Sequence, residues 1–318
     1  MPVLNDQQLA IVNEITNGFS NVNVIARAGC GKTYVLVNGV VLSIVENKLG
    51  SVALMAFNKS AANEFQLRID ALTQETKLYA LSGVDTGTVH SFGFRFWRNH
   101  VGKVNVDGWK VSNIIRNLFG DKSKNGEYEF QSQVMKLVSL AKQHVWSPED
   151  VMLKGMELIE HYDIEANGSA GEIIDAASVT LGASNTQRSV IDFDDMIYLP
   201  VFFDVRVDQY DFVLIDEAQD TNEARRQLAF KMMKPNARLI AVGDDRQAIY
   251  GFTGANADSL DIIKQTLNSV EFPLTVTYRC PKAVVEEANR LVPDLIAHES
   301  APTGVVRTIA KMVKKVTN

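Results

Sequence analysis

Short apolar runs bounded by polar or glycine-containing segments recur near both ends of the chain. The pattern predicts strands at residues 21–26, 51–57, 212–215 and 238–242, and the first leads into a glycine-rich turn and a helix that begins near Lys32. Strands that alternate with helices indicate an α/β fold with a parallel sheet and crossover connections. Because ligands of such sheets bind beyond the carboxyl ends of the strands, we expect the glycine-rich turn and the acids that follow the two later strands to converge there.

The middle of the chain, between about residues 96 and 186, has a helical pattern instead. Residues 111–119 place five apolar side chains on one face of a predicted helix: Val111, Ile114, Ile115, Leu118 and Phe119. Further on, Ser147 is a predicted N-cap, Pro148 the first helical residue and Asp150 an acid three positions after the cap. The pattern therefore predicts a helical insertion within the α/β unit.

Composition narrows the class of protein. The 318 residues are 46% hydrophobic, which is typical of a soluble globular protein with two or three domain-sized units. No apolar run approaches the roughly 20 residues of a membrane helix, so we expect no membrane partner. The two cysteines, Cys30 and Cys280, are too few for a disulfide framework and favour a cytoplasmic protein.

The net charge of −6 argues against a protein that binds nucleic acid through its overall charge. Residues 88–124 differ from the whole, because they contain seven basic and two acidic residues. Five aromatic residues are interleaved with them: Phe92, Phe94, Phe96, Trp97 and Trp109. Basic residues neutralise phosphates and aromatic faces stack on unpaired bases, so this segment is a candidate single-strand surface. A core of aromatics surrounded by solvated basic residues explains the same composition equally well.

Residues 25–34, IARAGCGKTY, nearly match the phosphate-binding pattern G-x-x-x-x-G-K-[ST], with Ala26 in place of the first glycine. Such a loop turns backbone N–H groups around phosphate oxygens at the start of a helix, whose dipole favours an anion. In this interpretation Lys32 reaches the β- and γ-phosphates, and the Thr33 hydroxyl binds Mg²⁺. The alternative is a strand-to-helix turn of small residues. Cys30 is then a small filler, or else a reactive thiol at a helix N-terminus.

Asp216 and Glu217 directly follow the predicted strand at residues 212–215. An acid pair at this place is suited to holding Mg²⁺ through water and to activating an attacking water. The alternative is that these acids only cap the next helix, since Asp220 and Glu223 have the spacing of a capping box. That alternative explains Asp216 poorly.

The segment at residues 242–255 mixes acids, an amide and aromatics in a loop punctuated by glycine. Gln247 is suited to sensing a γ-phosphate or orienting a water molecule. Tyr250 and Phe252 are suited to stacking on bases, although each aromatic taken alone is better explained as a core residue.

Taken in order along the chain, these segments resemble the motifs of the UvrD/Rep-like superfamily 1 DNA helicases. The resemblance covers most of the chain, and ARAGCGKT matches the family's own A-x-x-G-x-G-K-T loop, which accounts for Ala26. It implies a RecA-like P-loop NTPase domain that binds ATP and Mg²⁺ and acts on single-stranded DNA with 3′-to-5′ polarity. The implied ATP-binding domain comprises residues 1–95 and 187–270, the helical insertion residues 96–186, and the start of an incomplete second RecA-like domain residues 271–318.

The resemblance also implies roles for individual residues at the nucleotide. Catalytic roles are implied for Lys32, for Glu217 as the base, for Gln247 as the phosphate sensor and for Arg279 as an arginine finger. Mg²⁺ would be bound by Thr33 and linked to Asp216. Gln8 and Tyr278 are implied to contact adenine. The full set of implied ATP-binding residues is Gln8, Ala28, Gly29, Cys30, Gly31, Lys32, Thr33, Tyr34 and Tyr278.

DNA-facing motifs are implied at residues 56–65 and 88–97 and in the loop at 242–255. The implied DNA-binding residues are Phe57, Asn58, His90, Tyr250 and Phe252. The chain departs from the family pattern at several of these places. Phe57 lies one position later than the family's stacking phenylalanine, Phe252 replaces a tryptophan, and Tyr34 stands where arginine is common.

The residues after Arg279 are fewer than the 100 or so that a second motor domain requires, and the family's motifs V and VI are absent from them. We therefore expect this chain to form the nucleotide-binding part of a motor protein. A partner chain is one source of the second lobe. A second hypothesis is a nucleotide-gated DNA-binding module that has no ATPase activity on its own.

Overall fold

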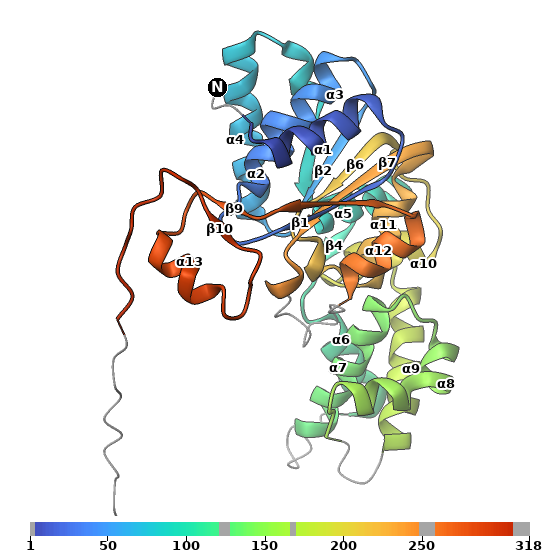
Figure 1. Ribbon diagram of the computed structural model, residues 1–318. Coiled ribbons are helices and arrows are strands. Elements are labelled where there is room, and N and C mark those ends of the chain that lie inside the picture. Colours follow the sequence, from blue (N-terminus) through green and yellow to red (C-terminus); the bar gives the residue numbers. More distant parts are fainter. Residues whose placement is uncertain (1–3, 121–127, 166–169, 248–257, 308–318) are drawn as a thin grey trace, which may run out of the picture.

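The centre of the computed structural model, which describes residues 4–120, 128–165, 170–247 and 258–307, is a six-stranded sheet. The strands lie in the order β3-β2-β6-β7-β1-β8, and all neighbours are parallel (Figure 1). Their bounds are β1 Val22–Ala26, β2 Val52–Ala56, β3 Asp85–Thr88, β6 Tyr210–Ile215, β7 Met233–Gly243 and β8 Val270–Leu274. The parallel α/β sheet expected from the sequence is confirmed.

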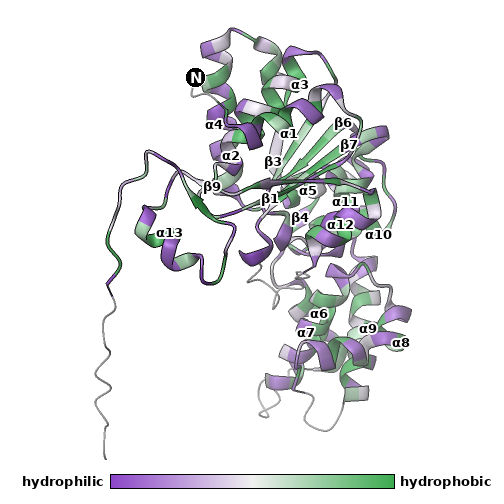
Figure 2. Cartoon of the chain, viewed as in Figure 1, coloured by the Kyte–Doolittle hydropathy of each residue, from purple (hydrophilic) through white to green (hydrophobic). Residues whose placement is uncertain are grey.

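Helices cover both faces of this sheet, which is why the inner strands are apolar along most of their length (Figure 2). In β2, Val52 and Leu54 pack on one face, whereas Ala53 and Met55 pack on the other. The first face is covered by α1 Asp6–Asn17, α2 Lys32–Tyr34, the π-helical turn Val35–Val41, α3 Leu42–Glu46 and α4 Lys59–Thr76. The opposite face is covered by α5 Val89–Val101, α10 Asp195–Phe202, α11 Glu223–Lys231 and α12 Ser259–Leu267.

A separate helical core lies beyond α5 and α10 (Figure 1). It is built from α6 Lys110–Phe119, α7 Tyr128–Gln143, α8 Pro148–His161 and α9 Ala170–Thr186, with a parallel ribbon of β4 Asn105–Val106 and β5 Val190–Ile191 beside it. The capping box predicted at Ser147 is present, with Pro148 in the first turn of α8. On α6, Ile114 and Ile115 are buried as expected, but Leu118 is 46% exposed.

Helix α5 joins the two cores. Its residues Phe92 and Phe96 pack against the sheet, whereas Trp97 packs into the helical core. The helix crosses α10 closely at Gly93. A Cβ atom added there would lie 2.1 Å from the backbone oxygen of Met196. We propose that the helical core is an insertion within the α/β domain, at about residues 96–186.

The chain after β8 leaves the main sheet. It forms a small parallel sheet of β9 Val276–Thr277 and β10 Ile296–Ala297, with α13 Lys282–Ala288 between them. Elsewhere in the described chain, 3-10 turns lie at Tyr79–Gly83, Ala218–Asp220 and Asp245–Gln247. Within the described ranges, no helix has the length and apolar composition needed to cross a bilayer.

Candidate functional site

The glycine-rich turn lies between the carboxyl end of β1 and the start of α2. Gly29 and Gly31 have φ angles of 73° and 81°, a left-handed conformation that glycine adopts without a Cβ penalty. Ala26 is the last residue of β1, where the backbone is extended and a methyl group is tolerated. The turn thus directs backbone N–H groups to the N-terminus of a helix, which is the geometry of an anion site. Ala28 is exposed at this turn, and Thr33 and Tyr34 in α2 are half-buried.

The segment after β9 packs directly on this turn. The backbone N–H of Tyr278 donates to the carbonyl oxygen of Gly29 at 3.0 Å. A Cβ atom added at Gly29 would lie 2.6 Å from Thr277 Oγ1 and 2.7 Å from Arg279 Cβ, so only glycine allows the approach. Exposed Arg279 and Tyr278 are therefore held beside the turn.

Gln8 reaches the same place from α1. Its side chain is only 3% exposed, and its Oε1 accepts a hydrogen bond from the backbone N–H of Asn5 at 3.1 Å. Asn5 Nδ2 donates to the Tyr278 hydroxyl at 2.8 Å. The Gln8 Nε2 atom lies 3.4 Å from the position of a Cβ added at Gly31. Gln8 and Tyr278 thus form one side of the turn, although they are far apart in the sequence.

Lys32 and Glu217 form an ion pair across the site. Lys32 Nζ lies 2.5 Å from Glu217 Oε2, with the two side chains 15% and 33% exposed. Glu217 lies two residues beyond the carboxyl end of β6, after Asp216. Its backbone is left-handed, with a φ angle of 50°. Gln219 Nε2 donates to the same Glu217 oxygen at 2.9 Å. The predicted base and the predicted phosphate-binding lysine are therefore in direct contact.

Asp216, the acid predicted to be linked to Mg²⁺, is buried beside Glu217. Its side chain is 7% exposed, and burial, followed by the charge of Glu217, raises the pKa of Asp216 to about 7. Its Oδ1 is buried without a hydrogen-bond partner, which fits a group that receives an outside ligand. In the part of the chain that the structure describes, no cluster of three or more His, Cys, Asp or Glu residues has the geometry to hold a metal.

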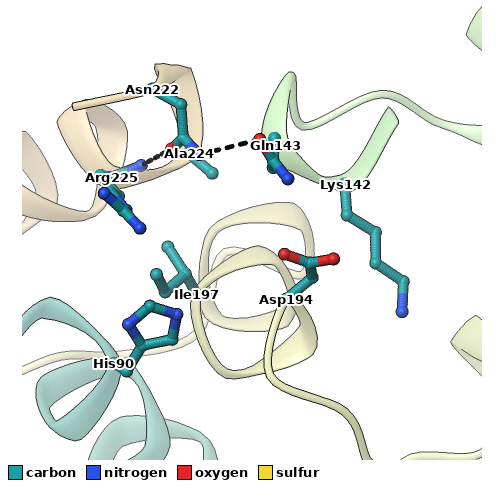
Figure 3. Close-up of a pocket in the computed structure, with 8 residues that line it drawn as sticks. All are labelled: His90, Lys142, Gln143, Asp194, Ile197, Asn222, Ala224 and Arg225. Atoms are coloured by element: carbon teal, nitrogen blue, oxygen red, sulfur yellow. Dashed lines mark hydrogen bonds between the residues drawn. The ribbon is translucent and has the colours of Figure 1, made fainter. Parts of the chain in front are cut away.

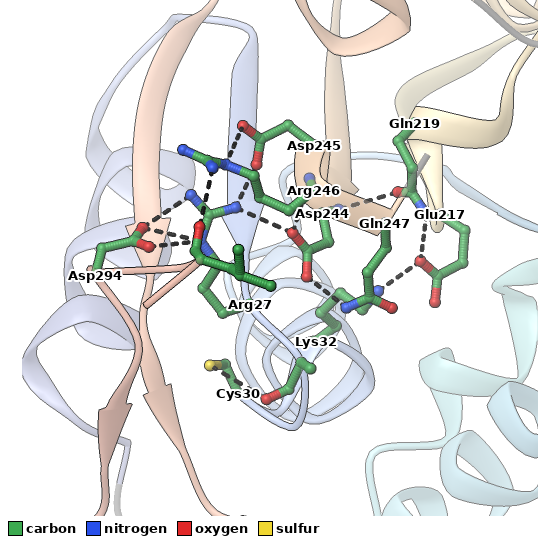
Figure 4. Close-up of polar contacts among 12 residues, drawn as sticks. Arg27, Cys30, Lys32, Glu217, Gln219, Asp244, Asp245, Arg246, Gln247 and Asp294 are labelled. Atoms are coloured by element: carbon green, nitrogen blue, oxygen red, sulfur yellow. Dashed lines mark hydrogen bonds and ion pairs between the residues drawn. The ribbon is translucent and has the colours of Figure 1, made fainter. Parts of the chain in front are cut away.

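Gln247 and Cys30 also lie at this edge of the sheet (Figure 4). Gln247 is exposed, and its Nε2 donates to Asp244 Oδ2 at 2.5 Å. Cys30 is 2% exposed, and burial, with the charge of Asp244 second, raises the pKa of its thiol to about 12. A buried thiol of this kind fills space, which favours the filler interpretation over the reactive thiol.

His90, one of the predicted DNA-binding residues, lies at a second region, a cavity of about 210 Å³ (Figure 3). His90 and Arg225 line it, and the Arg225 guanidinium lies 5.1 Å from the centre of the Phe57 ring. Burial, and secondly the charge of Arg225, lowers the pKa of His90 to about 4, so the imidazole is neutral at pH 7. Exposed Asn58 caps α4, since its Oδ1 accepts a hydrogen bond from the backbone N–H of Ala61 at 2.9 Å.

The five aromatic residues proposed as a single-strand surface differ in burial, and Phe94 is half-buried against the helical core. Phe92, Phe96 and Trp97 are at most 1% exposed and belong to the cores, so the core alternative is correct for them. Trp109 is 71% exposed. The predicted stacking residues Tyr250 and Phe252 lie outside the described residues.

Three polar residues of these two regions were not anticipated from the sequence. Arg27 is 6% exposed within the turn, Gln219 links Glu217 to the strand that follows, and Arg225 lies against His90. Arg27 alone had a detectable sequence signal, because it is a charged residue between two alanines in a loop of small residues.

Comparison with known proteins gives the same family for these motifs. Residues 4–268 match the model of the UvrD/REP helicase N-terminal domain. The chain is 26% identical over 314 residues to a probable DNA helicase II homolog of Mycoplasma capricolum, which covers 92% of this chain and 41% of that protein. It is 23% identical to the ATP-dependent DNA helicase Rep of Buchnera aphidicola subsp. Schizaphis graminum (85% and 41% covered) and 24% identical to the ATP-dependent DNA helicase PcrA of Leuconostoc citreum (88% and 40%). The chain thus spans about two fifths of the length of these relatives.

Proposed function

The chain belongs to the UvrD/REP helicase family, and from that premise we propose that it binds Mg·ATP and single-stranded DNA and hydrolyses ATP. The observation that supports this most strongly is the contact between Lys32 and Glu217, with Asp216 next to them, at the carboxyl edge of a parallel sheet. That edge is where α/β sheets bind their ligands. Bound Mg²⁺ would supply positive charge to the phosphates, shared with Thr33 and Asp216.

The side chains have separate tasks in this proposal. Lys32 leaves Glu217 and binds the β- and γ-phosphates, which frees the Glu217 carboxylate to accept a proton from the attacking water. Gln247 contacts the γ-phosphate, and Arg279, exposed beside Gly29, donates to the charge that develops on it. Because phosphoryl transfer depends mainly on positioning and charge stabilisation, these groups are sufficient in type for the reaction.

Adenine and DNA occupy different ends of the domain in this proposal. Gln8 and Tyr278 contact adenine beside the glycine-rich turn. DNA lies over the region of Phe57, Asn58 and His90, where neutral His90 is a hydrogen-bonding group and not a cation. We propose 3′-to-5′ movement on single-stranded DNA for the complete protein, and a cytoplasmic location.

A second candidate function follows from the length of the chain relative to its relatives. Since it spans about two fifths of them, the chain could be a nucleotide-gated DNA-binding module whose ATPase requires a second lobe from a partner chain. Steady-state ATP hydrolysis, measured with and without single-stranded DNA, distinguishes the two functions. Hydrolysis that rises with DNA and is absent in Lys32→Ala supports the enzyme. Nucleotide-dependent DNA binding without hydrolysis supports the module, and failure to bind either ligand refutes both.

A further inference from the structure

Arg27 is a buried cation inside the turn that receives the phosphates, and three carboxylates surround it (Figure 4). Its Nη1 lies 3.0 Å from Asp244 Oδ1 and is also paired with Asp245. Its Nε donates to both oxygens of Asp294, at 2.9 and 3.0 Å, and its Nη2 lies 2.8 Å from Asp294 Oδ2. The arginine therefore connects the turn to the end of β7 and to the segment after α13.

Asp244 extends this contact to the predicted catalytic residues. Asp244 is 2% exposed. One of its carboxylate oxygens accepts a hydrogen bond from Arg27, and the other accepts one from Gln247 Nε2 at 2.5 Å. Its backbone N–H donates to Gln219 Oε1 at 3.0 Å, and Gln219 Nε2 donates to Glu217 at 2.9 Å. A continuous series of polar contacts thus leads from Arg27 to both Gln247 and Glu217.

Arg27 determines whether Asp244 can keep this position. Burial alone would lower the pKa of Arg27, but its hydrogen bonds to the three carboxylates outweigh burial and raise the pKa above its usual value. Without this cation, Asp244 would be a buried carboxylate with no counter-charge, which is strongly unfavourable. It would take up a proton or turn towards solvent, and in either case its contact with Gln247 would change.

We propose that Arg27 is a positioning residue for recognition of the γ-phosphate. It fixes the carboxylate of Asp244, which in turn fixes the side-chain amide of Gln247 beside the phosphate-binding turn. This inference rests on the proposed role of Gln247 as the phosphate sensor. It predicts that Arg27 affects the discrimination between ATP and ADP, because only ATP has the phosphate that Gln247 contacts.

The test is calorimetric titration of the full chain with Mg·ADP and with a non-hydrolysable Mg·ATP analogue. Arg27→Met should reduce the preference for the ATP analogue by on the order of tenfold, as should Gln247→Ala. The double variant should lose no more than either single variant, since both changes remove the same contact. ADP affinity should stay within about twofold of wild type. Arg290→Met is the matched control and should keep the preference, because Arg290 is an exposed arginine that pairs with Glu287 at 2.8 Å.

The inference is overturned if Arg27→Met keeps the wild-type preference, or if the losses in the double variant multiply. A wild-type chain that binds both nucleotides equally would also overturn it, but would leave the nucleotide site itself intact. A chain that binds neither nucleotide would refute the proposed function as well. If Arg27→Met does not fold, Asp244→Asn tests the same link, since it keeps the shape of the side chain and removes the charge that Arg27 holds. It should lose the preference to the same degree, and an unchanged preference in that variant contradicts the inference.

Discussion

Replacing Glu217 with glutamine should separate ATP binding from ATP hydrolysis. The Glu217 carboxylate pairs with Lys32, whose Nζ lies 2.5 Å from Oε2. Before Lys32 can bind phosphates, this ion pair has to break. Glutamine has nearly the same shape but no charge, so Glu217→Gln removes both the competitor for Lys32 and the proposed base.

The two effects have opposite signs and very different sizes. Coulomb's law gives about 2 kcal/mol for unit charges 2.5 Å apart in a water-like dielectric, and measured pairs that remain partly exposed retain about 0.5–1 kcal/mol. Relief of this competition should tighten ATP binding by roughly two- to fivefold. Loss of a general base should slow hydrolysis by about 10²- to 10⁴-fold. The variant should therefore bind ATP slightly better and turn it over hardly at all.

A titration with a fluorescent ATP analogue measures the first effect, and phosphate release in a single turnover measures the second. Glu223→Gln is the matched control, because Glu223 is an equally sized acid in α11 that pairs with Arg226 at 2.7 Å. The control should change neither quantity by more than about twofold. Hydrolysis by Glu217→Gln above a tenth of the wild-type rate, or weaker ATP binding, would refute the reasoning.

Three further changes test the fold. Gly93→Ala should lower stability by about 2 kcal/mol in urea unfolding, because its Cβ would lie 2.1 Å from the backbone oxygen of Met196, whereas Gly182→Ala, with its nearest contact at 3.7 Å, should not destabilise the protein. Arg238→Met should cost about 2–4 kcal/mol, since the guanidinium donates to four main-chain carbonyls at the end of α1 and the turn after it; a cost below about 1 kcal/mol would show that water replaces these bonds. Burial and a neighbouring carboxylate raise the pKa of Asp194 to about 6, so the folded protein binds this proton more tightly than the unfolded chain, and stability falls as the pH rises from about 4 to 6. At pH 8, Asp194→Asn should therefore raise the free energy of unfolding by about 1–2 kcal/mol and raise the melting temperature. This gain in stability should vanish below about pH 4.

The sequence was sufficient to predict the four inner strands of the sheet and the glycine-rich turn, because both depend on local patterns, whereas the edge strands β3 and β8 were not predicted. Apolar runs that end in glycine or acids predict buried parallel strands with polar groups beyond their carboxyl ends. The acids after β6 and the lysine of the turn then meet because parallel strands place those ends at one edge. The contact between Lys32 and Glu217 is a direct consequence of this arrangement.

The polar contacts that organise the site depend on residues far apart in the chain. Arg27 binds carboxylates 217, 218 and 267 positions away, and a sequence pattern contains no information on such pairs. The aromatic segment was ambiguous for a similar reason. Whether Trp97 or Trp109 stacks on a base depends on the side of each helix that another element covers, and the structure buries Trp97 and exposes Trp109.

The most direct test of the account is an equilibrium titration of the wild-type chain and Lys32→Ala with Mg·ATP. Lys154→Ala serves as the control, because Lys154 is an exposed lysine of α8 whose ion pair is with Asp150 of the same helix. The account predicts saturable binding by the wild type and the control, and a loss on the order of 10- to 100-fold in Lys32→Ala, because a charge-assisted contact with the phosphates is removed. Equal binding by wild type and Lys32→Ala, or no binding by the wild type, would contradict the claim that this edge of the sheet is a nucleotide site.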